Sequence, residues 1–158
     1  MANLRAYRLL ALLIPLGALM GAYGAQYLGG LYPCEMCWWQ RYPHFAALAL
    51  AALSFVVRNG HFRLVVIALA AMAILSSGLI GGFHAGVEYK WWEGLTRCAA
   101  PVSASSTDFA KSIMEAPLIR CDVSPWNLFG ISIAGYNFLL SSAGAIAILA
   151  GLWKNRTT

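Results

Sequence analysis

Residues 64–83 read LVVIALAAMAILSSGLIGGF, a run of 20 residues without a charged side chain. A bilayer core is about 30 Å thick, and a helix needs about 20 apolar residues to cross it. Two further runs meet that length, since residues 9–28 carry no charge over 20 residues and residues 128–153 carry none over 26. The chain is 60% hydrophobic and 11% charged, whereas soluble domains have about 25% charged residues. These features predict an integral membrane protein.

A fourth span is predicted from a shorter run. Residues 42–57 are uncharged, but they number only 16 between Arg41 and Arg58. A helix that begins near Cys37 would span comfortably, with the two tryptophans that follow it as anchors at the interface. The predicted fold class is an all-α, four-helix membrane bundle with two external loops that carry the cysteines. One domain over residues 1–158 is expected, with spans at about 9–28, 37–57, 64–83 and 128–153.

The distribution of charge predicts the orientation of these spans. The two termini and the segment between the second and third spans together carry +6 and no acidic residue. The loop at residues 29–41 is neutral and the loop at residues 84–127 carries −1, which gives the total of +5. Short basic segments stay in the cytoplasm, so both termini are expected there and both loops on the opposite side. The basic balance therefore reflects topology, and no nucleic-acid partner is expected because no basic cluster or recognition motif is present.

None of the four cysteines lies in the middle of a predicted span, and all fall on the predicted external side, where disulfides can persist. They are Cys34, Cys37, Cys98 and Cys121. Four cysteines allow three pairings, and we favour Cys34 with Cys37 and Cys98 with Cys121. A zinc site is an alternative, but structural zinc sites usually use two closely spaced pairs, and no metal is expected. A second alternative is a set of purely structural disulfides.

The spacing of Cys34 and Cys37 favours redox chemistry over bracing. A C-x-x-C bridge closes a very short loop and therefore stabilises little, whereas such motifs lower the thiol pKa and exchange readily. Pro33 favours a break just before a helix, and a helix N-terminus stabilises a thiolate. Arg41 lies four residues after Cys37 and would share its helix face. Its guanidinium could stabilise charge on sulfur or on an acceptor oxygen, or could simply anchor the helix at the interface.

These residues resemble the DsbB family of bacterial disulfide-bond-forming membrane proteins. The pattern Pro-Cys-x-x-Cys-x-x-Gln-Arg-Tyr-Pro occupies residues 33–43, and Cys-Asp-x-x-Pro-Trp occupies residues 121–126. Leu-Phe-Gly-Ile-Ser-x-Ala-Gly-Tyr-Asn follows at residues 128–137, and residues 84–88 and 91–94 are similar to some branches of the family. The resemblance extends over nearly the whole chain and includes the four cysteines in order.

The resemblance implies a thiol oxidase of the bacterial inner membrane. Its expected partner is a periplasmic DsbA-like protein of thioredoxin fold, and its expected electron acceptor is a membrane quinone, either ubiquinone or menaquinone. Cys98 would form the mixed disulfide with the partner, Cys121 would resolve it, and Cys34 would exchange with this second pair. Cys37 would face the quinone ring.

Two further residues are expected to bind quinone. Arg41 would lie beside Cys37, as the resemblance implies. His84 falls at the outer end of the third span and could donate a hydrogen bond to a quinone carbonyl. An interfacial ion pair between His84 and Glu88, four residues later, is the alternative for that histidine.

Two other functions remain open from the sequence. A quinone reductase of the vitamin K epoxide reductase type also combines a C-x-x-C with loop cysteines in a helical membrane protein. Here the C-x-x-C precedes the loop pair and opens the second span, and this order favours the DsbB interpretation. The remaining alternative is a non-enzymatic four-span scaffold whose disulfides only brace its loops.

Overall fold

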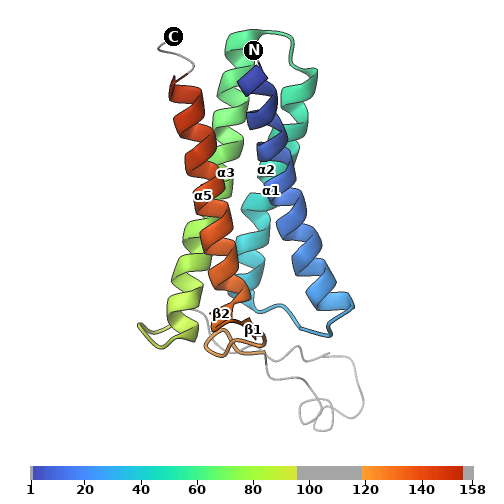
Figure 1. Cartoon of the computed structure of the whole chain (residues 1–158). Coiled ribbons are helices and arrows are strands. Elements are labelled where there is room, and N and C mark those ends of the chain that lie inside the picture. Colours follow the sequence, from blue (N-terminus) through green and yellow to red (C-terminus); the bar gives the residue numbers. More distant parts are fainter. Residues whose placement is uncertain (1, 96–118, 155–158) are drawn as a thin grey trace.

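The computed structural model describes residues 2–95 and 119–154. These residues are mainly helical, as predicted for an all-α membrane protein. Four long helices lie side by side (Figure 1), with α3 packed against α2 and α5, and α1 packed against the same two helices. The helices are α1 (Ala2–Tyr27), α2 (Glu35–Val56), α3 (Gly60–Glu88) and α5 (Ile133–Lys154).

Three of these helices, α1, α3 and α5, are long and apolar enough to cross a membrane. Helix α2 carries Glu35, Gln40, Arg41 and His44 in its first half, and these polar side chains lower its hydropathy. A membrane crossing by α2 therefore remains a prediction.

Local side chains define where α2 begins. Cys34 is the N-cap residue, with extended backbone angles (φ −76°, ψ 174°), and its sulfur accepts a hydrogen bond from the backbone N–H of Cys37. Ser, Thr, Asp and Asn are the usual N-cap residues, and here a thiol takes that role. The helix starts at Glu35, slightly before the start near Cys37 expected from the sequence.

A short hairpin precedes α5. Strand β1 (Asn127–Leu128) pairs antiparallel with β2 (Ile131–Ser132). Phe129 and Gly130, between them, have φ of 50° and 77°, and positive φ at both central residues is the signature of a type I′ turn. The sequence predicted a span from residue 128, but α5 begins at Ile133 because this turn reverses the chain first.

Different segments of the chain lie at the two ends of the helices. Figure 1 shows the start of α1, the connection from α2 to α3 and the end of α5 at one end, and the β1–β2 hairpin at the other. The segment between α1 and α2, which includes Cys34, also lies at the hairpin end. The charge distribution predicted that the two termini would lie at the opposite end from the cysteine-bearing segments. The orientation of these ends in a membrane remains a prediction.

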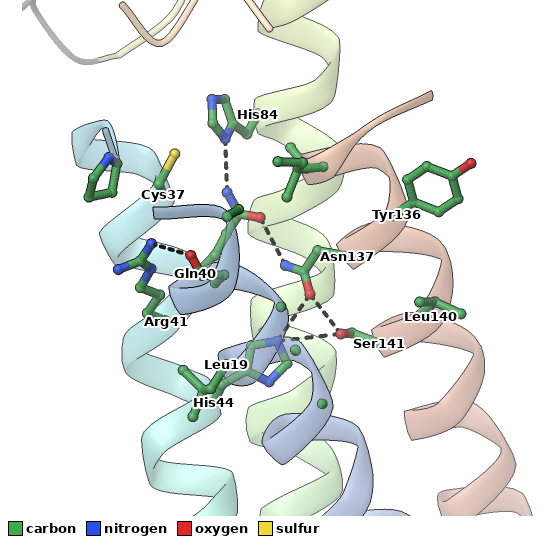
Figure 2. Close-up of a pocket in the computed structure, with 18 of the residues that line it drawn as sticks. Leu19, Cys37, Gln40, Arg41, His44, His84, Tyr136, Asn137, Leu140 and Ser141 are labelled. Atoms are coloured by element: carbon green, nitrogen blue, oxygen red, sulfur yellow. Dashed lines mark hydrogen bonds between the residues drawn. The ribbon is translucent and has the colours of Figure 1, made fainter. Parts of the chain in front are cut away.

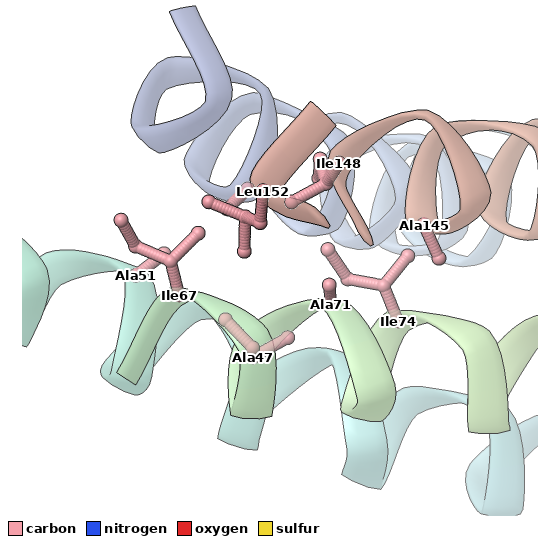
Figure 3. Packing of buried hydrophobic residues seen from close by; sticks show 10 residues of the cluster. Ala47, Ala51, Ile67, Ala71, Ile74, Ala145, Ile148 and Leu152 are labelled. Atoms are coloured by element: carbon pink, nitrogen blue, oxygen red, sulfur yellow. The ribbon is translucent and has the colours of Figure 1, made fainter. Parts of the chain in front are cut away.

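Small and branched apolar residues fill the interior toward the opposite end (Figure 3). Between membrane helices, small residues allow the backbones to approach closely, and dispersion contacts then stabilise the packing. We call this group the apolar cluster. Its buried members are Ala11, Ala47, Ala51, Ile67, Ala70, Ala71, Ile74, Ala145, Ile148 and Leu152.

Gly81 allows α3 to lie close to α5 nearer the hairpin end. A Cβ atom at this position would lie 2.9 Å from the carbonyl oxygen of Ala134 and 3.0 Å from Nδ2 of Asn137. It would also lie 3.1 Å from Oε1 of Gln40 on α2. The missing side chain therefore makes room for a polar contact between α2 and α5.

Candidate functional site: a thiol cluster beside a cavity

Cys34 and Cys37 lie together at the start of α2. Their sulfur atoms are 2.7 Å apart, and the backbone N–H of Cys37 donates to the sulfur of Cys34 over 3.2 Å. Cys34 is buried and Cys37 is partly exposed. The helix N-terminus therefore acts most directly on Cys34, because N–H groups there favour negative charge.

Cys121, from the second predicted loop, lies against this pair. It is buried and packs with Cys34, Met36 and Val87. The pKa of the Cys34 thiol is raised above its ordinary value, chiefly by a side-chain hydrogen bond with Cys121, then by one with Cys37 and by burial. Three of the four predicted site cysteines thus meet in space, and Cys98 lies outside the described residues.

Charged side chains hold the Cys121 segment against the end of α3. Nζ of Lys90 lies 2.6 Å from the backbone carbonyl of Asp122 and 2.7 Å from its carboxylate. Arg120 contacts the same carboxylate over 2.7 Å. These hydrogen bonds, first from Arg120 and then from Lys90, hold the pKa of Asp122 well below its usual value. Such exposed ion pairs add little stability, so their main effect is to fix the position of the loop.

His84 connects the thiols to the interior. Its Nε2 atom lies 3.6 Å from the sulfur of Cys34 and 3.8 Å from a carboxylate oxygen of Glu88. Its Nδ1 atom lies 2.8 Å from Nε2 of Gln40. Glu88 therefore lies beside His84, as the alternative interpretation of that histidine expected, and the same nitrogen also faces Cys34.

Arg41 is buried and directed toward α1. Its guanidinium donates to the side-chain oxygen of Gln26 over 2.6 Å and to the backbone carbonyl of Ala22 over 3.2 Å. It also lies over the rings of Tyr23 and Trp38, at 4.7 and 4.9 Å from their centroids. Arg41 therefore ties α2 to α1, and a guanidinium with five N–H donors can make further contacts.

A chain of polar side chains continues inward from His84 (Figure 2). Gln40 accepts from Nδ2 of Asn137 over 2.9 Å, and Oδ1 of Asn137 lies 3.0 Å from Nε2 of His44. Ser141 donates to the same oxygen of Asn137 over 2.8 Å. Buried polar groups cost free energy unless they are hydrogen-bonded, and these groups bond to one another across α2 and α5. Among the described residues, Nδ1 of His44 has no hydrogen-bond partner.

Two cavities meet at the thiols. The first, of about 500 Å³, is bounded by all four helices, and Arg41, His44 and Asn137 line it. The second, of about 270 Å³, is lined by Cys34 and by residues of the Cys121 segment. Cys37 and His84 line both cavities. Cys37 thus lies between the two cavities, and Cys34 lines the smaller one.

The sulfur atoms of Cys34 and Cys37 and a nitrogen of His84 lie within 4.8 Å of one another, close enough to share a metal ion. Structural zinc sites usually have four ligands. The trio supplies three, and Cys34 already contacts two other thiols. This arrangement fits thiol exchange better than a closed metal site.

Gln40, His44 and Asn137 were not among the site residues predicted from the sequence. A signal for them was present, because amide and imidazole side chains stand out within otherwise apolar spans and often mark functional positions there. The spacing alone did not reveal that residues 40, 44 and 137 meet, since that contact depends on how α2 and α5 pack.

These features define an all-α membrane protein with a buried cluster of thiols at one end of its helices. Residues 4–151 match the model of the family described as disulfide bond formation protein DsbB. The chain therefore belongs to the DsbB family, as the sequence motifs predicted, and takes part in disulfide bond formation.

A second comparison identifies a relative without an assigned function. The uncharacterized protein RP370 of Rickettsia prowazekii (strain Madrid E) is 25% identical over 138 residues, which cover 84% of this chain and 78% of that protein. No solved structure matches the chain significantly.

Proposed function

We propose that the chain is a membrane thiol oxidase that reoxidises a periplasmic DsbA-like dithiol protein and passes the electrons to a membrane quinone. The proposal places it in the bacterial inner membrane with both termini in the cytoplasm. The observation that carries it is the position of Cys34, which contacts Cys37 and also Cys121. A cysteine with two thiol neighbours from different segments can exchange its disulfide partner with little movement.

The proposed exchange step moves electrons from the loop to the C-x-x-C. The thiolate of Cys121 attacks the sulfur of Cys34 in an oxidised Cys34–Cys37 pair. The Cys34–Cys121 bond forms, the Cys34–Cys37 bond breaks, and the electron pair remains on Cys37 as a thiolate. Cys98 is proposed to start this sequence by forming the mixed disulfide with the partner protein.

Oxidation of one dithiol to a disulfide releases two electrons and two protons. A membrane quinone can accept both the electrons and the protons, and it is thereby reduced to a quinol. The larger cavity fits such a molecule, because its volume of about 500 Å³ lies within the usual range of about 300–1,000 Å³ for small-molecule sites. Its walls are mostly apolar, and Cys37 lines it.

Arg41 is the residue best suited to hold a quinone oxygen. It lines the larger cavity, and the bonds to Gln26 and Ala22 use two of its five N–H donors. His84 lines the same cavity, but both of its ring nitrogens lie near protein groups. We therefore propose Arg41 as the main quinone ligand and His84 as a wall of the site.

The deciding experiment uses the full chain in lipid nanodiscs with a reduced DsbA-like protein and a quinone. Loss of quinone absorbance is expected on addition of the reduced partner, with one quinone consumed per dithiol. Reduction of a quinone epoxide at a similar rate would instead favour the vitamin K epoxide reductase alternative. If quinone is not consumed and the cysteines stay oxidised in mild reductant, the scaffold alternative holds.

A further inference from the structure

Two backbone carbonyls fix the orientation of the buried amides. Nε2 of Gln40 lies 3.2 Å from the carbonyl oxygen of Met36, and Nδ2 of Asn137 lies 3.2 Å from that of Ser77. A carbonyl oxygen only accepts, so each amide must present its NH₂ group there. With both amides in these orientations, Asn137 Nδ2 also donates to Oε1 of Gln40.

These amides in turn determine where each neutral histidine carries its proton. The NH₂ group of Gln40 is a donor, so Nδ1 of His84, 2.8 Å away, must accept. Its single N–H is therefore on Nε2. Oδ1 of Asn137 is an acceptor, so Nε2 of His44, 3.0 Å away, must donate. The tautomer of an imidazole is generally set by the hydrogen bond of its other nitrogen.

The proton of His84 consequently faces the thiol cluster. Nε2 lies 3.6 Å from the sulfur of Cys34 and 3.8 Å from Oε1 of Glu88, and both of these atoms can accept. His84 also makes a hydrogen bond with the backbone of Cys121. Cys34 receives a second donor, the backbone N–H of Cys37 at 3.2 Å. Two N–H groups therefore converge on one sulfur, and His84 is only 3% exposed.

We propose that Gln40 is a positioning residue that holds His84 as its Nε2–H tautomer, so that His84 donates a hydrogen bond to Cys34 and does not act as its base. This inference rests on the proposed function only in taking Cys34 to exchange its disulfide partner. When a thiolate attacks Cys121 in a Cys34–Cys121 disulfide, a new bond to Cys121 forms and the Cys34–Cys121 bond breaks. The electron pair passes to Cys34, its thiolate is stabilised by the two donors, and no proton moves to or from His84.

The tautomer can be measured directly, because the chain has only three histidines. Full-length protein labelled with ¹⁵N-histidine in nanodiscs gives a nitrogen spectrum that can be assigned with His44→Gln, His61→Gln and His84→Gln. We expect His84 to show a protonated Nε2 and an unprotonated Nδ1. Two substitutions of Gln40 should change this result.

Gln40→Leu removes the donor to Nδ1, so both tautomers of His84 should appear. Gln40→Glu has nearly the same shape but presents carboxylate oxygens, so a proton should appear on Nδ1. Ser77→Ala is the matched control, because Ser77 bonds to Gln40 and Asn137 but not to His84. It should leave the spectrum of His84 unchanged, whereas a merely structural role of Gln40 predicts similar effects of all three variants.

The same variants can also be tested by the alkylation rate of Cys34. In reduced protein at fixed pH, the alkylation rate of Cys34 should fall about tenfold in Gln40→Leu, equivalent to about 1.4 kcal/mol, and should stay within about twofold of wild type in Ser77→Ala. The inference is overturned if wild-type His84 carries its proton on Nδ1, or if neither substitution of Gln40 changes the tautomer. If Gln40→Leu does not fold, the wild-type and Gln40→Glu spectra decide. Quinone reduction plays no part in these readouts, so a failure of the proposed function would be seen separately.

Discussion

The two halves of the helical structure are stabilised by different interactions. Toward the chain termini, α2, α3 and α5 meet through alanine, isoleucine and leucine, with no polar side chain in the apolar cluster. Toward the hairpin, the same helices meet through amides, imidazoles and hydroxyls, which surround a cavity. The first arrangement packs the helices, and the second orients particular atoms.

The comparison shows how a small membrane protein can separate stability from chemistry. Dispersion packing tolerates any well-fitting apolar side chain, so the apolar cluster carries little information about function. A buried hydrogen-bond chain specifies donors and acceptors, because an unmatched polar group there is costly. Substitutions in the two halves should therefore affect different measurements.

The largest effect is expected from Cys37→Ser. Quinone reduction should fall to background, because Cys37 lines the larger cavity and no other described cysteine does. Quinone absorbance in the presence of reduced DsbA-like protein measures this loss. The melting temperature should stay near that of the wild type, since Cys37 lies outside the apolar cluster.

Cys98→Ser is the companion variant. It should block turnover with the protein partner while the C-x-x-C still exchanges electrons with quinone. If both variants turn over at the wild-type rate, the cysteines are structural and the functional half of the comparison fails.

Arg41→Met should have the next largest effect. Loss of a hydrogen bond to a charged or polarised group costs about 1.5–3 kcal/mol, so the KM for quinone should rise about 10- to 150-fold. Arg41→Lys should raise it less, because it keeps the charge but loses the planar fork of donors. Steady-state kinetics over a range of quinone concentrations provides the measurement.

Gln26→Leu serves as the control for Arg41. It removes the 2.6 Å bond that ties Arg41 to α1 but keeps the guanidinium. If the role of Arg41 is only to join the helices, Gln26→Leu and Arg41→Met should behave alike. An unchanged KM in a well-folded Arg41→Met protein would contradict the quinone role.

In the other half, Ile74→Ala should lower stability without changing the chemistry. Ile74 is fully buried in the apolar cluster, and such truncations cost about 2–5 kcal/mol in soluble proteins. We expect about 2 kcal/mol here, because lipid reduces the transfer contribution while the cavity remains. Unfolding in mixed micelles gives the stability, and activity per folded molecule should be unchanged.

Leu69→Ala on the same helix is the control, since Leu69 is half exposed on the outer surface. Its effect should stay within about 0.5 kcal/mol. Equal destabilisation by both substitutions would show that packing in the apolar cluster does not determine the stability of the helical structure.

The sequence predicted the apolar half well and the hairpin poorly. Uncharged runs of sufficient length determine helices in lipid, since a helix satisfies its own backbone there. Helix α3 contains the predicted span at 64–83, and α1 covers the one at 9–28 except for its last residue. Residues 128–132 read as part of the last run, because hydropathy does not distinguish a short apolar turn from a helix. The positive φ values of Phe129 and Gly130 define that turn.

The cysteines of the site were predictable, but their surroundings were not. C-x-x-C spacing and the motif at residues 121–126 led to three thiols that meet in the structure. The chain Gln40–Asn137–His44 depends on side chains almost a hundred residues apart and on the close approach of α3 to α5 at Gly81. The sequence around these residues does not predict that close approach of the two helices.

The smallest predicted effect is a change in the pH dependence of one thiol. Only the thiolate is alkylated, and the raised pKa of Cys34, due chiefly to Cys121, keeps it protonated at a pH where an ordinary cysteine begins to react. Cys121→Ala removes the main cause, so the pKa should fall and the alkylation curve of Cys34 should move to lower pH. Peptide mass spectrometry of reduced protein alkylated across a pH series follows Cys34 separately from Cys37.

Ser124→Ala provides the matched control, because it changes the same segment without removing a thiol and should leave the curve in place. A curve that is unmoved in Cys121→Ala, or that moves to higher pH, would mean that Cys121 does not act on Cys34 in the reduced protein. The thiol half would then lack the contact between its two segments, and Cys34 could no longer be the point of exchange.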